Sequence, residues 1–205
     1  GQGEQVRANG LVVTNGNDSG EGSLRQAANN ANLDGVSSTI TFSGVSTVSL
    51  TSTAIEVNSS NALTIEGGAG VTVQRVSGSP DFSPFVTYSG NFTINNLTIT
   101  GGSQSGIQSQ GGTLTLNNCT ITDNSGFSGG GIYSMSQLTT INNSTISQNT
   151  VSSTGGGIYA AWELHINGST ISGNTTSNGS SGGIYVGSSF TLIDSTVSDN
   201  NALNG

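Results

Sequence analysis

Apolar residues alternate with polar ones in short stretches of this chain, and the stretches recur at a fixed spacing. Five segments from Phe92 onward align without gaps. Their central aliphatic residues, separated by 22, 25, 25 and 26 positions, are Ile99, Ile121, Ile146, Ile171 and Val197. Alternation with a period of two is typical of short, half-buried β-strands. Its recurrence at a fixed period predicts a repeat architecture.

A second landmark keeps the same period. Gly-Ile-Tyr triplets contain Ile132, Ile158 and Ile184, each 26 residues after the one before. Within a repeat the alternation breaks at an Asn pair, such as Asn117–Asn118, so two strands meet at a bend. The Gly-Ile-Tyr triplet adds a third strand. Three strands in each repeat predict one coil of a parallel β-solenoid, whose neighbouring coils pair at roughly 4.8 Å.

We therefore expect an all-β fold, a right-handed single-stranded parallel β-helix of about 7–8 coils with a short N-terminal capping helix. Residues 1–205 are predicted to form a single solenoid domain. Residues 1–38 would hold an N-terminal strand and the capping helix, 39–91 irregular coils, and 92–205 the regular repeats. Ser23 is a suitable N-cap, and the residues that follow it place Leu24, Ala27, Ala28 and Ala31 on one face.

Asparagines recur at equivalent positions of the repeat. Stacked coils would bring their side-chain amides into register, where they can form hydrogen-bonded ladders. One ladder is predicted for Asn117, Asn142 and Asn167, and another for Asn124, Asn149, Asn174 and Asn200. Pro80 and Pro84 bracket a predicted excursion from the coils, because proline lacks the donor that a stacked strand requires.

Composition narrows the range of partners. Only 7% of residues are charged, and the three arginines are outnumbered by 11 acids, giving a net charge of -8. Phosphate binding needs clustered basic residues, so we expect no nucleic-acid partner. No apolar run approaches the roughly 20 residues of a membrane span, so no membrane insertion is expected. Cys119 is alone and can form no internal disulfide.

The segment from Val13 to Ala27, Val-Thr-Asn-Gly-Asn-Asp-Ser-Gly-Glu-Gly-Ser-Leu-Arg-Gln-Ala, leads to a Thr-Ile-Thr-Phe stretch at 39–42. It resembles the amino-terminal cap of bacterial extracellular parallel β-helix proteins. The Ser-Thr-Ile-Ser-x-Asn and Gly-Gly-Gly-Ile-Tyr repeats are similar to those of polymorphic outer-membrane and adhesin-like proteins with a pectate-lyase-like solenoid. This resemblance covers nearly the whole chain and implies the fold and a secreted or cell-surface location.

Two surfaces are predicted to present regular arrays. Outward hydroxyls on one strand of each coil would form a flat face, comprising Thr98, Thr100, Thr120, Thr122, Thr145, Ser147, Thr170, Ser172, Thr196 and Ser198. Threonine also simply suits the solvent side of a strand. Tyr133, Tyr159 and Tyr185 would form an aromatic stripe that could contact sugar rings or a partner chain, or serve stability alone.

Candidate catalytic groups do not pair in the expected fold. The candidates are Asp123, Glu163, His165, Asp194 and Asp199. Asp123 and Asp199 share a repeat position but lie three coils apart, roughly 14 Å, which is too far for a glycosidase pair. His165 is the single histidine, so we expect no metal cluster, and we expect no cofactor. Cys119 takes an inward position and is interpreted as a packing residue.

These observations favour a non-enzymatic extracellular structural protein, either a fibre or filament subunit or an adhesin. After Asn200 no closing helix follows up to Gly205, so copies are expected to associate head to tail. Surface glycans or ice are the other expected partners. An ice-binding (antifreeze) protein that uses the flat Thr/Ser face is one alternative, and a polysaccharide-active lyase or hydrolase is another.

Overall fold

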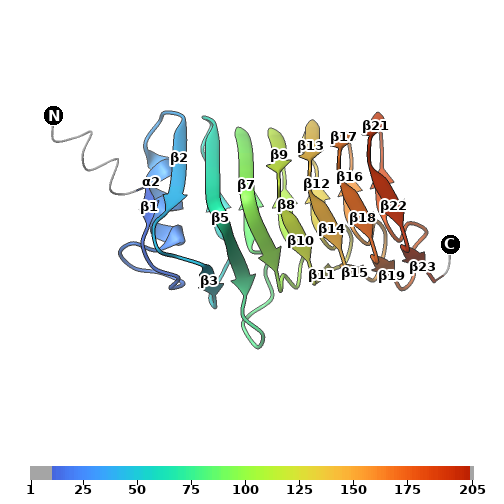
Figure 1. The fold of residues 1–205 in the computed structure, drawn as a ribbon, viewed down its shortest axis with the longest axis horizontal. Coiled ribbons are helices and arrows are strands. Elements are labelled where there is room, and N and C mark those ends of the chain that lie inside the picture. Colours follow the sequence, from blue (N-terminus) through green and yellow to red (C-terminus); the bar gives the residue numbers. More distant parts are fainter. Residues whose placement is uncertain (1–10, 204–205) are drawn as a thin grey trace.

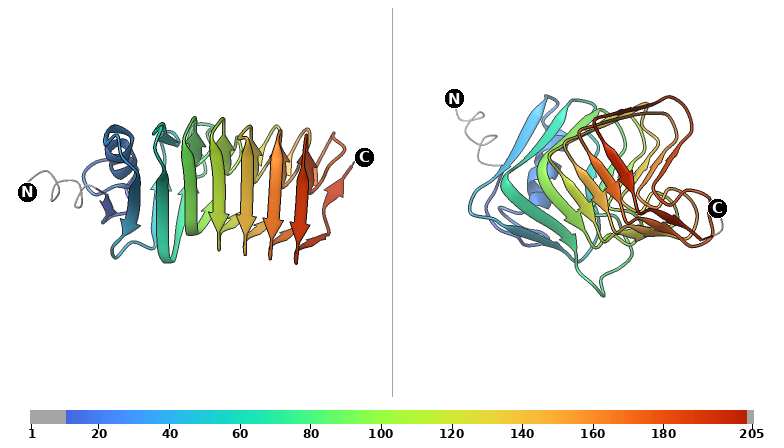
Figure 2. Two further views of the ribbon diagram at one scale, coloured as in Figure 1. Left: turned by 90° about the horizontal axis from the view of Figure 1, so that it is seen from above. Right: turned by 45° about the vertical axis from the view of Figure 1, so that its right-hand side comes forward.

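A computed structural model describes residues 11–203, so the first ten residues of the predicted N-terminal segment and Gly205, mentioned above, lie outside the described residues. The chain winds into a parallel β-solenoid of about eight turns, confirming the predicted fold class (Figure 1). The coils stack along the long axis of the molecule, with the helix at the N-terminal end and residue 203 at the other (Figure 2).

The first segments close the N-terminal end. They are β1 (Val12–Val13) and α2 (Leu24–Leu33). Ser23 is the N-cap, as predicted, and its hydroxyl accepts a hydrogen bond from the Gln26 N–H. The buried face of the helix is the predicted one, Leu24, Ala27, Ala28 and Ala31. Because these side chains cover the first coil, the apolar interior is not open to water at this end.

The irregular coils carry five strands before the regular repeats. They are β2 (Ser38–Phe42), β3 (Thr47–Leu50), β4 (Ile55–Val57), β5 (Leu63–Arg75) and β6 (Phe85–Thr87). Strand β5 is continuous, with a shift in its pairing register between Glu66 and Val71. The predicted excursion lies between β5 and β6, where the Arg75 guanidinium stacks on Phe82 with its Cζ 5.6 Å from the ring centroid.

The regular region begins with one long strand, β7 (Asn91–Thr100), and a short one, β8 (Ile107–Ser109). Each later coil contains two strands of the 13-stranded sheet and then a two-residue strand, followed in all but the last described coil by the Gly-Ile-Tyr strand. The two-residue strand was not predicted. The first of these coils has β9 (Thr113–Asn117), β10 (Thr120–Thr122), β11 (Ser125–Gly126) and β12 (Ile132–Ser134).

The next two coils repeat this order with the same strand lengths. They contain β13 (Leu138–Asn142), β14 (Thr145–Ser147), β15 (Thr150–Val151), β16 (Ile158–Ala160), β17 (Glu163–Asn167), β18 (Thr170–Ser172), β19 (Thr175–Thr176) and β20 (Ile184–Val186). The last has β21 (Phe190–Ile193), β22 (Thr196–Ser198) and β23 (Asn201–Ala202). All described strand pairs are parallel, forming sheets of 13, six and four strands.

Aliphatic side chains stack in columns inside the coils. Ile121 pairs with Ile146, and Ile146 pairs with Ile171, in direct register. A second column runs through Ile40, Ile65, Ile94, Leu116, Ile141 and Ile166, and a third through Ile55, Phe85, Ile107, Ile132 and Ile158, all buried. Their removal from water supplies the main favourable term in folding.

Candidate functional site

The outer face of the 13-stranded sheet carries the predicted hydroxyl array. Its ten residues point outward, with partial or full exposure, and lie in register from coil to coil. One rank contains Thr98, Thr120, Thr145, Thr170 and Thr196, and the other contains Thr100, Thr122, Ser147, Ser172 and Ser198. Residues two apart on a strand and adjacent coils give the array spacings of roughly 6.7 Å and 4.8 Å.

The first rank is longer than the sequence indicated. Thr72 pairs with Thr98, and Thr47 pairs with Thr72, so seven threonines follow one another along the solenoid. Both residues keep the repeat spacing, since Thr47 and Thr72 are 25 residues apart and Thr72 and Thr98 are 26 apart, although residues 39–91 were expected to form irregular coils. The second rank extends in the same way through Gln74 and Ser49, whose side chains share a hydrogen bond of 3.1 Å.

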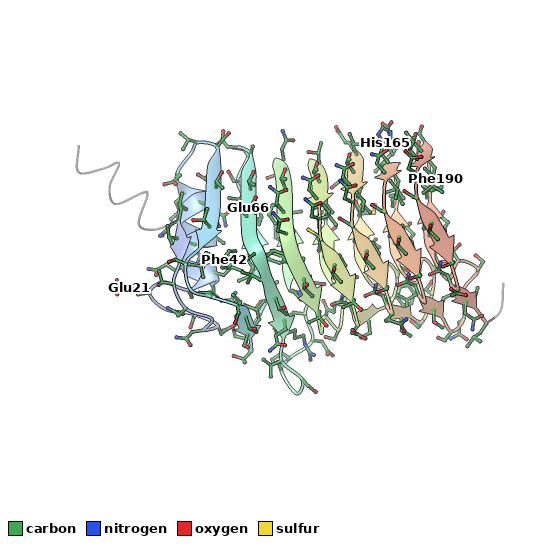
Figure 3. The ribbon with its side chains drawn as sticks, viewed as in Figure 1. Glu21, Phe42, Glu66, His165 and Phe190 are labelled. Carbon is green, nitrogen blue, oxygen red and sulfur yellow. The ribbon has the colours of Figure 1, made fainter. Side chains whose placement is uncertain are left out.

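A parallel rank of hydroxyls lies on the preceding strand of each coil. It contains Thr39, Thr64, Thr93, Thr115, Thr140, His165 and Thr191. His165 interrupts the threonines, and its Nε2 lies 2.8 Å from Oε1 of Glu163. Glu66 and His165 lie on strands several coils apart (Figure 3). The charged groups of this face are therefore dispersed, which leaves long uncharged stretches between them.

The first predicted Asn ladder is present and borders the array. Asn142 Nδ2 donates to Asn117 Oδ1 at 2.8 Å, and Asn167 Nδ2 donates to Asn142 Oδ1 at 2.9 Å. Asn117 continues the ladder to Asn95 at 2.8 Å, and Asn95 donates to Glu66 Oε2 at 3.1 Å. Hydrogen bonds from the Asn96 amide and the Gly68 N–H hold the pKa of Glu66 below its usual value.

The second predicted ladder is buried and has the opposite direction. Asn124, Asn149 and Asn174 each donate from Nδ2 to the Oδ1 of the next asparagine, ending at Asn200, over 2.9–3.1 Å. The same Nδ2 atoms donate to backbone carbonyls of Ile99, Ile121 and Ile146. This ladder therefore joins the coils from inside, where a missing hydrogen bond is costly.

Cys119 belongs to a column of small residues beside the bend. Its backbone N–H donates to Ser144 Oγ, and the N–H of Ser144 donates to Ser169 Oγ, both at 3.0 Å. The thiol is buried, as predicted, and burial raises its pKa. A thiol with a raised pKa is a weak nucleophile at neutral pH. The position thus serves packing and backbone hydrogen bonding.

The three tyrosines of the predicted stripe stack on one another. Ring centroids of Tyr133 and Tyr159 are 5.0 Å apart at 14°, and those of Tyr159 and Tyr185 are 4.8 Å apart at 10°. Burial, with smaller contributions from the two neighbouring tyrosines, raises the pKa of Tyr159. Both faces of Tyr159 are covered by its neighbours. Tyr133 and Tyr185 are the two ends of this stack, and each packs on Tyr159 with one ring face.

The predicted turn acids occupy backbone positions with positive φ. Asp123 and Asp199 have φ of 56° and 55° at the same turn of different coils, and Asp194 has φ of 48° at the preceding turn. Asn and Asp are the non-glycine residues that best tolerate this conformation, so turn geometry accounts for them. Among residues 11–203, no three His, Cys, Asp or Glu side chains form a group that could hold a metal ion.

One acid and one arginine tie the N-terminal cap to the coils. Arg25 forms a 2.8 Å ion pair with Asp18 and donates to the carbonyls of Thr53 and Ala54. Burial alone would raise the pKa of Asp18, but hydrogen bonds from Ser52, Thr51 and Arg25 outweigh it and lower the pKa. This cluster is structural, since its polar groups are directed at one another.

The last coil exposes side chains that are interior in the others. The interior columns continue into this coil with Phe190, Leu192 and Val197. The exposed fractions of these three residues are 43%, 42% and 45%. Phe190 lies in the terminal coil, near His165 of the preceding one (Figure 3). In the part of the chain that the structure describes, no helix has the length and apolarity to cross a membrane.

Comparison with known families agrees with this architecture. A family model described as a right handed beta helix region matches residues 9–167 and again residues 85–205. The overlapping matches reflect the repeated coils, which fit the model in more than one register. No curated protein and no solved structure matches the chain significantly. The stacked parallel coils and the family match together place this chain in the right-handed β-helix family.

Proposed function

We propose that this protein is a non-enzymatic extracellular structural or adhesive module, a stiff rod that presents long uncharged polar faces. The observation that supports this most is the outer face of the 13-stranded sheet, where two ranks of hydroxyl side chains run from coil to coil. Such a face offers an extended contact area. Two amide ladders that join successive coils resist their separation and stiffen the rod.

The extracellular part of this proposal draws on the resemblance of the N-terminal cap to bacterial surface proteins. The dispersed acids add support, because most glycoside hydrolases use two carboxyl groups that lie within about 5–9.5 Å of each other. The test is incubation of the protein with acidic and neutral polysaccharides, followed by measurement of reducing ends and unsaturated products. Release above a heat-inactivated control would overturn the non-enzymatic proposal and favour a polysaccharide lyase or hydrolase.

Self-association is the second element of the proposal. The exposed apolar side chains of the last coil, together with its unpaired strand edges, are features that proteins normally cover. At the opposite end α2 already covers the first coil. Head-to-tail stacking would therefore require α2 to move aside. Electron microscopy and sedimentation at rising concentration distinguish filaments, pairs joined through the last coil, and monomers.

Ice binding is a second candidate, favoured by the seven in-register threonines of the long rank. If this face binds ice, the protein shows thermal hysteresis, and Thr120→Lys or Thr145→Lys abolishes it by placing a charge in the array. Ser152→Lys, at an exposed turn outside both ranks, is the matched control. Absence of hysteresis in the unmodified protein excludes this candidate and leaves the structural proposal in place.

A further inference from the structure

Phe127 is an anomaly on the surface of the rod. Its side chain is 75% exposed, in a chain with few aromatic residues. The N–H of Ser152 donates to the Gly126 carbonyl and that of Ser153 to the Phe127 carbonyl, so Ser152 occupies the equivalent position in the next coil. Since serine serves there, folding does not require an aromatic residue at this turn.

Phe127 and Tyr133, which is one end of the tyrosine stack, lie beside a shallow groove. The groove, of about 180 Å³, is lined by Gln104, Gln108, Phe127, Ser128 and Tyr133. Phe127 follows β11 and Tyr133 lies in β12, and the glycine run between them turns the chain so that both contribute to one groove. Gly129 has φ of 59°, a conformation that glycine adopts at little cost.

Tyr133 borders the groove at the end of the tyrosine stack. One face of its ring stacks on Tyr159, and the residue in register with it on the preceding coil is Gln108, not an aromatic. The stripe therefore cannot act as a row of three platforms. Its end beside Gln108 can act as one.

Amide groups line the same groove. Gln108 Nε2 donates to the Gln104 carbonyl at 3.0 Å, and its Oε1 accepts from Gln110 Nε2 at 3.4 Å. These contacts hold the Gln108 side chain in place across the turn. Gln104 and Ser128 also line the groove, so polar residues lie beside the aromatic rings.

We propose that the groove between Phe127 and Tyr133 binds one ring of a neutral glycan. A pyranose has an apolar face that packs on aromatic rings and hydroxyls that pair with amides. The five lining residues carry no charge, and the net charge of -8 disfavours an acidic sugar. The volume is below the roughly 300–1,000 Å³ of a drug-sized pocket, which suits a single ring.

This inference rests on the proposed adhesive function and names a ligand class for it. The test is a ¹H–¹⁵N NMR titration of the full chain with cellohexaose, maltohexaose and mannohexaose, with trigalacturonate as the charged comparison. We expect at least one neutral hexasaccharide to shift the side-chain amides of Gln104 and Gln108, with a Kd on the order of 1 mM. Trigalacturonate should bind at least tenfold more weakly.

Variants locate the site. Phe127→Ser, which introduces the residue of the next coil, should weaken binding at least tenfold, whereas Phe127→Tyr should stay within about threefold, because the ring is retained. Tyr88→Ser removes an exposed aromatic outside the groove and should change nothing. Circular dichroism and thermal melting check that Phe127→Ser is folded.

Unchanged binding in Phe127→Ser, or shifts confined to residues outside the groove, would overturn the proposal. So would the absence of shifts with all three neutral probes at about 20 mM, some twentyfold above the expected Kd. A titration with an uncharged peptide that shifts the same amides more strongly would reassign the groove to protein partners. The polysaccharide cleavage and microscopy experiments do not involve Phe127, so the rod's proposed function and this site can fail independently.

Discussion

Nδ2 of Asn95 donates a hydrogen bond of 3.1 Å to Oε2 of Glu66, and this contact ends the outer amide ladder. Every amide of that ladder donates toward the N-terminal coils, and Asn95, Asn117 and Asn142 also accept from the C-terminal side. A carboxylate accepts but does not donate. Glu66 can therefore end only a ladder whose amides donate toward it, as those of this ladder do.

Replacing Glu66 by glutamine tests this role. The carboxylate accepts from the side chains of Asn95 and Asn96 and from the Gly68 N–H. A glutamine amide would turn its own N–H groups toward at least one of these donors, so we expect a loss of about 1 kcal/mol in the free energy of unfolding. Urea denaturation measures it, and an unchanged midpoint would show that the ladder does not depend on its carboxylate end.

The buried ladder should contribute more than the outer one. The Asn149 side chain makes four hydrogen bonds, donating to Ile121 and Asn174 and accepting two from Asn124. Asn149→Ala leaves buried groups unpaired and should cost about 2–4 kcal/mol, whereas Asn142→Ala, in the half-exposed ladder, should cost about 1 kcal/mol. Paired urea titrations give the two values. Equal losses would mean that burial does not distinguish the ladders.

Gly157 explains why glycine precedes Ile-Tyr in each repeat. A Cβ at this position would lie 2.8 Å from Asn174 Nδ2 and 2.9 Å from the Gly183 carbonyl oxygen. Gly157→Ala should therefore destabilise by about 1–3 kcal/mol through overpacking. Where space is available, Gly→Ala stabilises a protein by reducing the freedom of the unfolded chain. A stabilising Gly157→Ala would therefore show that this position is not closely packed. Ser152→Ala, exposed in the same coil, is the control for thermal melting.

Periodicity made the interior of this fold predictable from sequence. Ile121, Ile146 and Ile171 recur at equal spacing, and they stack if each repeat forms one coil that lies directly on the one before. Ser23 and the apolar face after it identified the helix, because capping and amphipathicity are local signals. The Asn ladders were predictable for the same reason as the core, since residues at one repeat position superpose.

The candidate sites were less predictable. Thr47 and Thr72 keep the repeat spacing, but the register shift within β5 offsets the strand before Thr72, so the coils before Phe92 looked irregular in the sequence. Tyr133 and its neighbours were identified as a stripe, but ring spacing decides which faces stay open. Phe127 has no periodic signal in the sequence, and its exposure follows only from the turn on which it lies.

The Asp18–Arg25 ion pair should make the N-terminal cap sensitive to acid. Asp18 accepts from the Thr51 N–H at 3.0 Å and from Ser52 Oγ, besides pairing with Arg25. Because its folded pKa is lowered, the carboxylate stabilises the fold above the pKa of the unfolded chain, about 3.9. That contribution is lost as the pH falls below about 4 and through the folded value.

Asp18→Asn should therefore reduce the free energy of unfolding by about 2 kcal/mol at pH 7, where charge-assisted hydrogen bonds are lost. The difference between the parent protein and the variant should shrink steadily below about pH 4, because protonation removes the same charge from the parent. Urea unfolding at a series of pH values measures both. Asp123→Asn, at an exposed turn where asparagine also tolerates positive φ, should leave stability unchanged. A constant gap for Asp18→Asn down to pH 2 would assign its effect to geometry and not to charge.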